Sequence, residues 1–140
     1  MTKAVAVDLG ARRIGVAVSD AAGALAFPRP FIERRKDRAS DHDTIAQVVD
    51  EVGAEVVVVG LPLSLDGRRG PAAQAAEAEA EELARALEGR DVRVETFDER
   101  LTTVSADAAL GSAGAGSRQR RMRIDSAAAA VLLQSWLDSQ

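Results

Sequence analysis

The chain has 140 residues, a formal net charge of −4 and no cysteine. Its length predicts one domain, residues 1–140, and the absence of cysteine excludes disulfides, thiolate zinc sites and cysteine nucleophiles. Because no apolar stretch reaches membrane-spanning length and no secretory leader pattern is present, we expect a cytoplasmic protein without a membrane partner.

Three strands are predicted in the first quarter of the chain. Residues 3–9 and 13–19 are apolar on both faces, as central strands covered on two sides must be. The three residues between them allow only a hairpin. A third strand is expected within 24–33, where Pro28 and Pro30 confine it to an edge of the sheet, because proline cannot donate a ladder hydrogen bond.

Helix and strand patterns then alternate. Apolar residues recur at helical spacing from Ile45 onward, and we expect this helix to be capped by Ser40 or Asp41 and to stop at Gly53. The run Val56–Val59 is β-branched throughout, which is typical of a buried parallel strand.

The second half of the chain is richer in helix signals. Pro71 suits the first turn of a helix that Gly89 ends. Residues 92–97 alternate apolar and charged side chains and predict a strand near an edge. A short helix is expected from about 102 to 110, and an apolar final helix from near Asp125.

The resulting order is βββαβαβαα. Crossover units add parallel strands to an antiparallel start, so the sequence predicts an α/β fold with a mixed five-stranded sheet, spatial order 3-2-1-4-5, and flanking helices. This arrangement is the ribonuclease H-like architecture.

Acidic residues gather at one edge of that predicted sheet. Asp8 lies in an apolar strand, where a lone carboxylate costs several kcal/mol unless something positive compensates it. Glu99 follows the fifth strand and Asp125 is expected at the start of the final helix, and the predicted topology brings both towards Asp8. Carboxylates that share a small volume need cations, and a pair of Mg²⁺ or Mn²⁺ ions serves phosphodiester hydrolysis in this way.

Two local basic patches stand out against the acidic total. Residues 34–38 contain four cations, and we interpret them as a solvated loop. Residues 118–123 contain four arginines and no acidic residue, and Asp125 follows shortly after them. This composition favours a phosphate-binding role.

The motifs resemble the YqgF/RuvX family, whose members are named as pre-16S rRNA nucleases and are related to Holliday-junction resolvases. The similarity rests on four blocks in family order: Asp8–Asp20, Val59–Pro62 with the following Asp66-Gly67 and Gly70-Pro71, Asp98–Thr103 and Arg123–Asp125. The resemblance implies a catalytic, metal-binding triad of Asp8, Glu99 and Asp125. It also implies that the arginines handle backbone phosphate, namely Arg13, Arg118, Arg120, Arg121 and Arg123.

The resemblance implies a nucleic-acid substrate, either the 5′ end of pre-16S rRNA or branched DNA, and the residues do not separate the two. Resolvase relatives carry an acid at the end of the fourth strand, where this chain has Gly60, so Glu99 would have to reach over from the neighbouring strand. A two-fold substrate would call for a homodimer.

Other interpretations stay open at this point. Asp8 would serve as a structural residue if it bonded only to backbone amides, and Asp125 would serve as the N-cap of its helix. The protein would then be a non-catalytic nucleic-acid-binding factor in ribosome maturation or transcription. A third interpretation takes Asp8-Leu9-Gly10 as the phosphate motif of actin-like ATPases, but such proteins need two lobes and this chain has residues for one.

Overall fold

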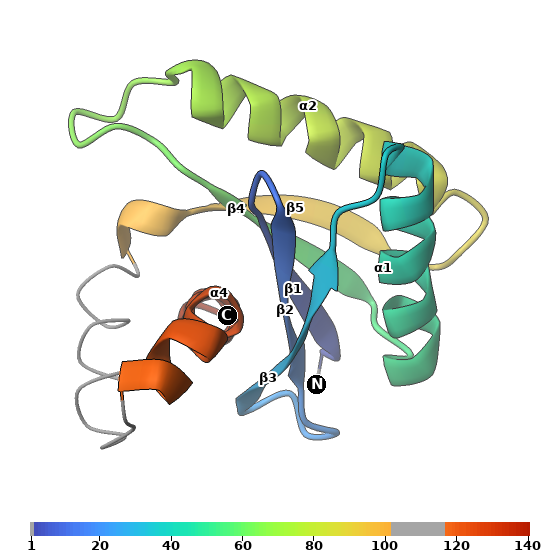
Figure 1. The fold of residues 1–140 in the computed structure, drawn as a ribbon. Helices are drawn as coiled ribbons and strands as arrows, with labels where there is room; N and C mark the ends of the chain where they lie inside the picture. The colour runs from blue at the N-terminus through green and yellow to red at the C-terminus, as the bar shows by residue number, and fades with distance from the viewer. Residues whose placement is uncertain (1, 102–116) are drawn as a thin grey trace.

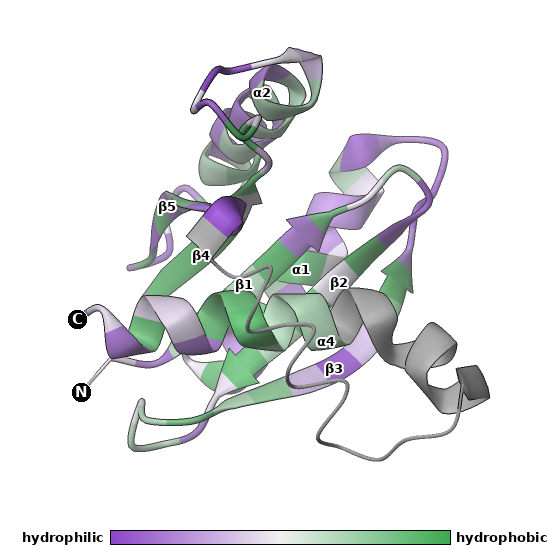
Figure 2. Cartoon of the chain, turned by 90° about the vertical axis from the view of Figure 1, so that its left-hand side faces the viewer, coloured by the Kyte–Doolittle hydropathy of each residue, from purple (hydrophilic) through white to green (hydrophobic). Residues whose placement is uncertain are grey.

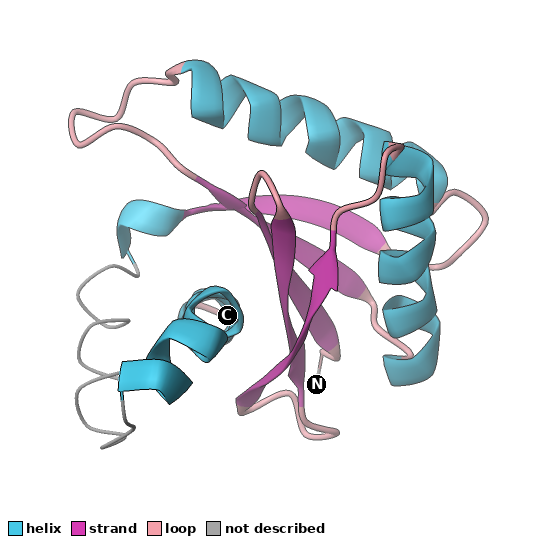
Figure 3. Ribbon diagram, viewed as in Figure 1, coloured by secondary structure: helices cyan, strands magenta, loops and turns pink. Residues whose placement is uncertain are grey.

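The computed structural model describes residues 2–101 and 117–140, with side chains for 2–100 and 127–140. Five strands form one sheet: β1 (Ala4–Leu9), β2 (Arg13–Ser19), β3 (Ala26–Glu33), β4 (Val56–Leu61) and β5 (Arg93–Asp98). Their spatial order is β3-β2-β1-β4-β5. The β1–β2 and β2–β3 pairs are antiparallel, while β4 runs parallel to both β1 and β5 (Figure 3). The predicted α/β, ribonuclease H-like sheet is confirmed.

Helices cover both faces of this sheet. Figure 1 shows α1 (Arg38–Val52) and α2 (Pro71–Ala86) on one side and α4 (Ser117–Asp138) on the other. A single 3₁₀ turn, η1 (Glu99–Leu101), follows β5. Among the helices that the structure describes, none is both long and apolar enough to cross a bilayer.

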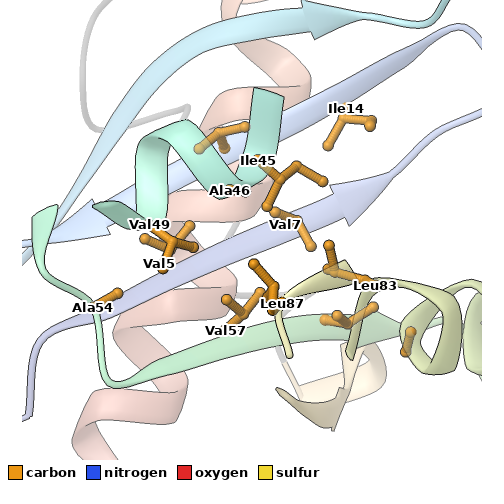
Figure 4. Packing of buried hydrophobic residues seen from close by; sticks show 13 residues of the cluster. Val5, Val7, Ile14, Ile45, Ala46, Val49, Ala54, Val57, Leu83 and Leu87 are labelled. Atoms are coloured by element: carbon orange, nitrogen blue, oxygen red, sulfur yellow. The ribbon is translucent and has the colours of Figure 1, made fainter. Parts of the chain in front are cut away.

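The core has two parts because alternate residues of each strand point to opposite faces. On the side of α1 and α2, strand residues such as Val7 and Val57 pack against Ile45 and Leu83 (Figure 4). On the other side, β1, β2 and β4 pack against α4, and Trp136 is buried there. Figure 2 shows α4 lying across the sheet over apolar strand residues. Both faces of β1 and β4 are therefore dry, as their apolar runs predict.

Two helix starts differ from the predictions. The N-cap of α1 is Asp37, whose Oδ1 accepts a hydrogen bond of 2.8 Å from the amide of Ser40. The predicted caps are wrong because Asp41 is drawn into a buried network described below. Helix α4 begins at Ser117, so Asp125 lies inside the helix and is not its N-cap. The helix expected over 102–110 falls outside the described residues.

The end of α1 follows the sequence. Gly53 adopts φ 70° in the left-handed region, and its amide donates to the carbonyl of Val49. A residue without a Cβ atom adopts this conformation with little strain, so the chain can turn sharply into β4.

Candidate active site

The strand directions concentrate functional groups at one rim of the sheet. The parallel strands β1, β4 and β5 all end there, and β3, which runs antiparallel to β2, ends at the same rim. Asp8 is the next-to-last residue of β1 and is half-buried. The turn that follows is tight: a Cβ atom at Gly10 would lie too close to the carbonyl oxygen of Arg13, so glycine is required for this hairpin.

Glu99 reaches Asp8 from two strands away. It sits in η1 just after β5, and its side chain lies across the end of β4 at Gly60. A Cβ atom at Gly60 would lie 2.9 Å from Cδ and 3.0 Å from Cγ of Glu99, and closer still to Oε1. Any side chain on β4 here would displace the carboxyl. The expectation that Glu99 reaches over from the neighbouring strand is therefore matched by the structure.

The two carboxyl groups interact directly. Burial, the charge of Asp8 and a hydrogen bond with Asp8 raise the pKa of Glu99 to about 8, and the charge of Asp98 acts in the same direction. A hydrogen bond between two carboxyl groups requires one of them to hold a proton. Without a cation the site is thus under electrostatic stress, which a bound metal ion would relieve.

Asp98 points to a different partner. Its carboxylate accepts hydrogen bonds from Arg100, the shortest being 2.6 Å from Nη2, and these bonds lower the pKa of Asp98. Neighbouring residues of an extended segment face opposite ways, so only one of the two adjacent acids lies beside Asp8. That acid is Glu99, as the motif resemblance implies.

A cleft of about 620 Å³ opens beside the two acids. Its floor includes the turn after Asp8 and the end of β4, and one wall is the start of α2. Residues 34–38, which we call the basic segment, contribute Arg34, Arg35, Lys36 and Arg38 to the lining. Negative and positive side chains thus line the same hollow.

Arg34 ties the basic segment to the rest of the site. Its guanidinium makes a bidentate pair with Glu79 of α2, at 2.6 and 2.9 Å, and its Nε donates to the carbonyl of Gly10 at 3.0 Å. Asp41 of α1 lies 3.4 Å from Nη1, and the His42 ring nitrogen Nε2 lies 2.9 Å from Oε2 of Glu79.

This network is almost fully shielded from solvent. Asp41, His42 and Glu79 are only 1%, 3% and 4% exposed. The hydrogen bonds with Glu79 raise the pKa of Arg34; burial alone would raise that of Glu79, but its bonds with Arg34 and His42 outweigh this effect and lower it. A buried charge pair of this kind is costly to break, so the network fixes its members in place.

Of the remaining predicted site residues, the structure describes the side chain of Arg13 only. Arg13 is exposed at the start of β2, and its Cζ lies 4.9 Å from the ring centroid of Phe31. Asp125, Arg118, Arg120, Arg121 and Arg123 belong to the first turns of α4, but their side chains lie outside the described residues. The structure therefore brings together two of the three predicted acids, Asp8 and Glu99.

The basic segment exposes Arg35, Lys36 and Arg38 to solvent, as the sequence predicts, and it also lines the cleft at the acidic rim. This position follows from the strand order: the third strand runs parallel to the first, so the residues after it emerge at the acidic rim.

The donor chemistry at this rim fits a hard divalent cation. Asp8 and Glu99 offer only oxygen ligands, which suit magnesium and manganese. Within the described part of the chain, no three histidine, cysteine or acidic residues are grouped closely enough to hold an ion. A third ligand would have to come from elsewhere, and α4 carries Asp125.

Comparison with known proteins gives consistent matches over nearly the whole chain. A family model described as "RuvX: Holliday junction resolvase" matches residues 2–139. A protein of Rhodococcus opacus (strain B4) named "Putative pre-16S rRNA nuclease" is 46% identical over 139 residues, covering 97% of this chain and 77% of its own. A protein of the same name from Anaeromyxobacter sp. (strain Fw109-5) is 45% identical over 135 residues, covering 96% and 95%.

Solved structures share the fold. RuvC of Thermus thermophilus, in complex with a Holliday junction substrate, matches with a TM-score of 0.63 and 14% identity over 99% of this chain and 95% of that one. The yeast mitochondrial Holliday junction resolvase Ydc2 matches with a TM-score of 0.55 and 10% identity, covering 97% and 78%. At such identities the likeness concerns the fold alone.

Proposed function

The chain belongs to the RuvX family, and from this premise we propose that it is a metal-dependent nuclease that hydrolyses phosphodiester bonds in structured nucleic acid. The observation that carries the proposal is the meeting of Asp8 and Glu99 over Gly60, at one end of a cleft with a basic wall. Acids from separate strands are held together there although they repel each other.

The chain's own residues have distinct roles in this proposal. Asp8 and Glu99, with Asp125 from α4, would hold two magnesium or manganese ions. When bound, such ions lower the pKa of an attacking water and stabilise the leaving oxygen. Arg13 and the arginines of α4, Arg118, Arg120, Arg121 and Arg123, would neutralise phosphates on either side of the scissile bond.

The family name suggests two substrates, the 5′ end of pre-16S rRNA and branched DNA. Both present phosphates to the same cleft, and phosphate contacts carry no sequence information. A four-way junction has two equivalent cleavage sites, so its resolution would need a homodimer, which light scattering would detect. Ribosomal RNA processing by a cytoplasmic monomer makes no such demand.

The decisive experiment replaces Asp8 with asparagine. Labelled pre-16S rRNA leader and a labelled four-way junction are incubated with manganese, and cleavage is followed on denaturing gels. We expect the Asp8→Asn variant to lose cleavage while it keeps its fold, because asparagine fills the same space without the charge. The matched control is Asp50→Asn, since Asp50 is exposed on α1 and pairs only with Arg90 among the described residues.

The outcomes separate the candidate functions. Full activity of purified Asp8→Asn protein would refute the mechanism. Tight binding of either nucleic acid by the wild-type protein with no cleavage in any divalent metal would favour the non-catalytic binding factor.

A further inference from the structure

The cleft has cations on one wall that the proposed catalytic set does not include. Arg35 and Lys36 are both exposed, and both line the hollow that contains Asp8 and Glu99. They come from the loop between β3 and α1, whereas residues 118–123 belong to α4. The two groups of cations therefore belong to different elements.

The backbone that carries these two cations is held rigidly. The amide of Arg35 donates a 2.8 Å hydrogen bond to the buried carboxylate of Asp41. On one side, Arg34 is fixed by its pair with Glu79 and its amide bonds to the carbonyl of Arg12. On the other side, the cap of α1 anchors Asp37. The segment is thus fixed on both sides of the exposed cations, before any ligand arrives.

Unlike neighbouring basic residues, Arg35 and Lys36 form no side-chain hydrogen bond or ion pair of 4 Å or less with an acid in the part of the chain that the structure describes, and Arg35 interacts with nearby Asp37 only through its charge. Arg38 pairs with Glu82 at 3.0 Å, and the arginines of the β4–α2 loop pair with Asp66 and Glu77. Among the described residues, no acceptor forms a hydrogen bond or ion pair with the side chains of Arg35 or Lys36. Two adjacent cations on a fixed backbone, beside a pair of carboxylates, are suited to bind an anion that spans the cleft.

We propose that Arg35 and Lys36 bind backbone phosphates of a nucleic-acid strand that crosses the cleft beside the phosphate held at Asp8 and Glu99. This inference rests on the proposed nuclease function and assigns one side of its substrate path to the basic segment. Because a polyphosphate chain carries a charge at every nucleotide, one strand can meet both the catalytic acids through metal ions and this wall directly. The contacts are to the backbone and do not depend on base sequence.

The test measures binding separately from cleavage. The double variant Arg35→Gln/Lys36→Gln is compared with wild type by fluorescence anisotropy, using a labelled RNA duplex and a labelled four-way DNA junction in EDTA over a range of salt concentrations. Both residues are exposed, so the variant should fold. The matched control is Lys3→Gln/Arg85→Gln, which removes the same charge from residues that do not line the cleft.

We expect the double variant to bind about 10- to 30-fold more weakly at 0.15 M salt, with a salt slope smaller by roughly 2, because two phosphate contacts are lost. The control should shift neither quantity appreciably. Weakening on only one of the two probes would support the inference and identify the substrate class that uses this wall.

Several results would overturn the inference. Wild-type affinity and slope in the double variant, with cleavage intact, would show that the substrate lies elsewhere while the nuclease function stands. An equal loss of affinity in the control variant would show that the weakening comes from the change in overall charge and not from this surface. Conversely, specific weakening in a protein that never cleaves would support this surface and refute the proposed catalysis.

Discussion

Removing the charge of Glu99 should stabilise the metal-free protein, and the gain should grow with pH. Glutamine keeps the shape of the side chain over Gly60, and its amide can donate a hydrogen bond to Asp8 without holding an acidic proton. The Glu99→Gln variant therefore relieves the repulsion between two carboxylates that burial makes severe.

The size of the effect follows from linkage. The pKa of Glu99 is about 8 in the folded protein against 4.5 ordinarily, so folding favours the protonated form. The contribution of this group to stability is complete below pH 4.5 and is lost as the pH rises towards 8. At 1.36 kcal/mol per pKa unit, the wild-type protein loses roughly 3 kcal/mol between pH 4.5 and 7 through this group. The variant does not.

The assay is urea unfolding in EDTA at pH 5, 6, 7 and 8, followed by the fluorescence of Trp136, which is buried against the sheet and is the one tryptophan of the chain. The difference in free energy of unfolding between variant and wild type should widen steadily with pH. Exposed Glu88 provides the control, because Glu88→Gln should leave the pH profile of wild type unchanged.

Divalent metal should make the wild-type protein more stable to unfolding than the Glu99→Gln variant. Magnesium or manganese bound between Asp8 and Glu99 would stabilise the wild-type protein by about 4.1 kcal/mol at a concentration of 1,000 times the Kd, which exceeds the roughly 3 kcal/mol that it loses through Glu99 at pH 7. The Glu99→Gln variant should gain less because it has lost a ligand. If the stability gap in EDTA is the same at pH 5 and pH 8, the two carboxyl groups do not interact as described and the argument for a cation between them fails.

Two further substitutions test the surroundings of the site. Gly60→Ala should displace Glu99 and lower manganese-dependent cleavage by about 100-fold with an unchanged circular dichroism spectrum, whereas Gly70→Ala, which meets no atom within 4 Å, should not. Glu79→Ala should destabilise the protein by about 3 kcal/mol in urea unfolding, because half-buried Arg34 loses its bidentate partner. Glu82→Ala removes an exposed ion pair and should cost under about 1 kcal/mol. Equal effects within either pair would contradict the corresponding contact.

The sheet could be predicted from sequence because each strand is determined by residues that are close together in the chain. Val56–Val59 is apolar and β-branched at every position, and all four residues are fully buried between helices. Pro28 and Pro30 place their strand at an edge, which is where the structure has β3. These signals depend on neighbours within a few residues, so periodicity and turn chemistry were sufficient.

The parts that could not be predicted depend on contacts between distant residues. Nothing within a few positions of Arg34 indicates that it pairs with Glu79, which lies 45 residues away. That same network takes Asp41 from the role of helix cap and turns the basic segment towards the acids. The approach of Glu99 to Asp8 is indicated in the sequence only by Gly60 near the end of β4. That glycine can be interpreted only when β5 is known to be the neighbour of β4.

The prolines of β3 also limit how two copies of this chain can associate. β3 forms one outer border of the sheet, and proline lacks the amide hydrogen that an incoming strand would need. Growth of the sheet across this border into a second molecule is therefore disfavoured, which protects the fold from edge-to-edge aggregation. A functional pair of subunits would have to meet through helices, loops or the opposite border of the sheet at β5.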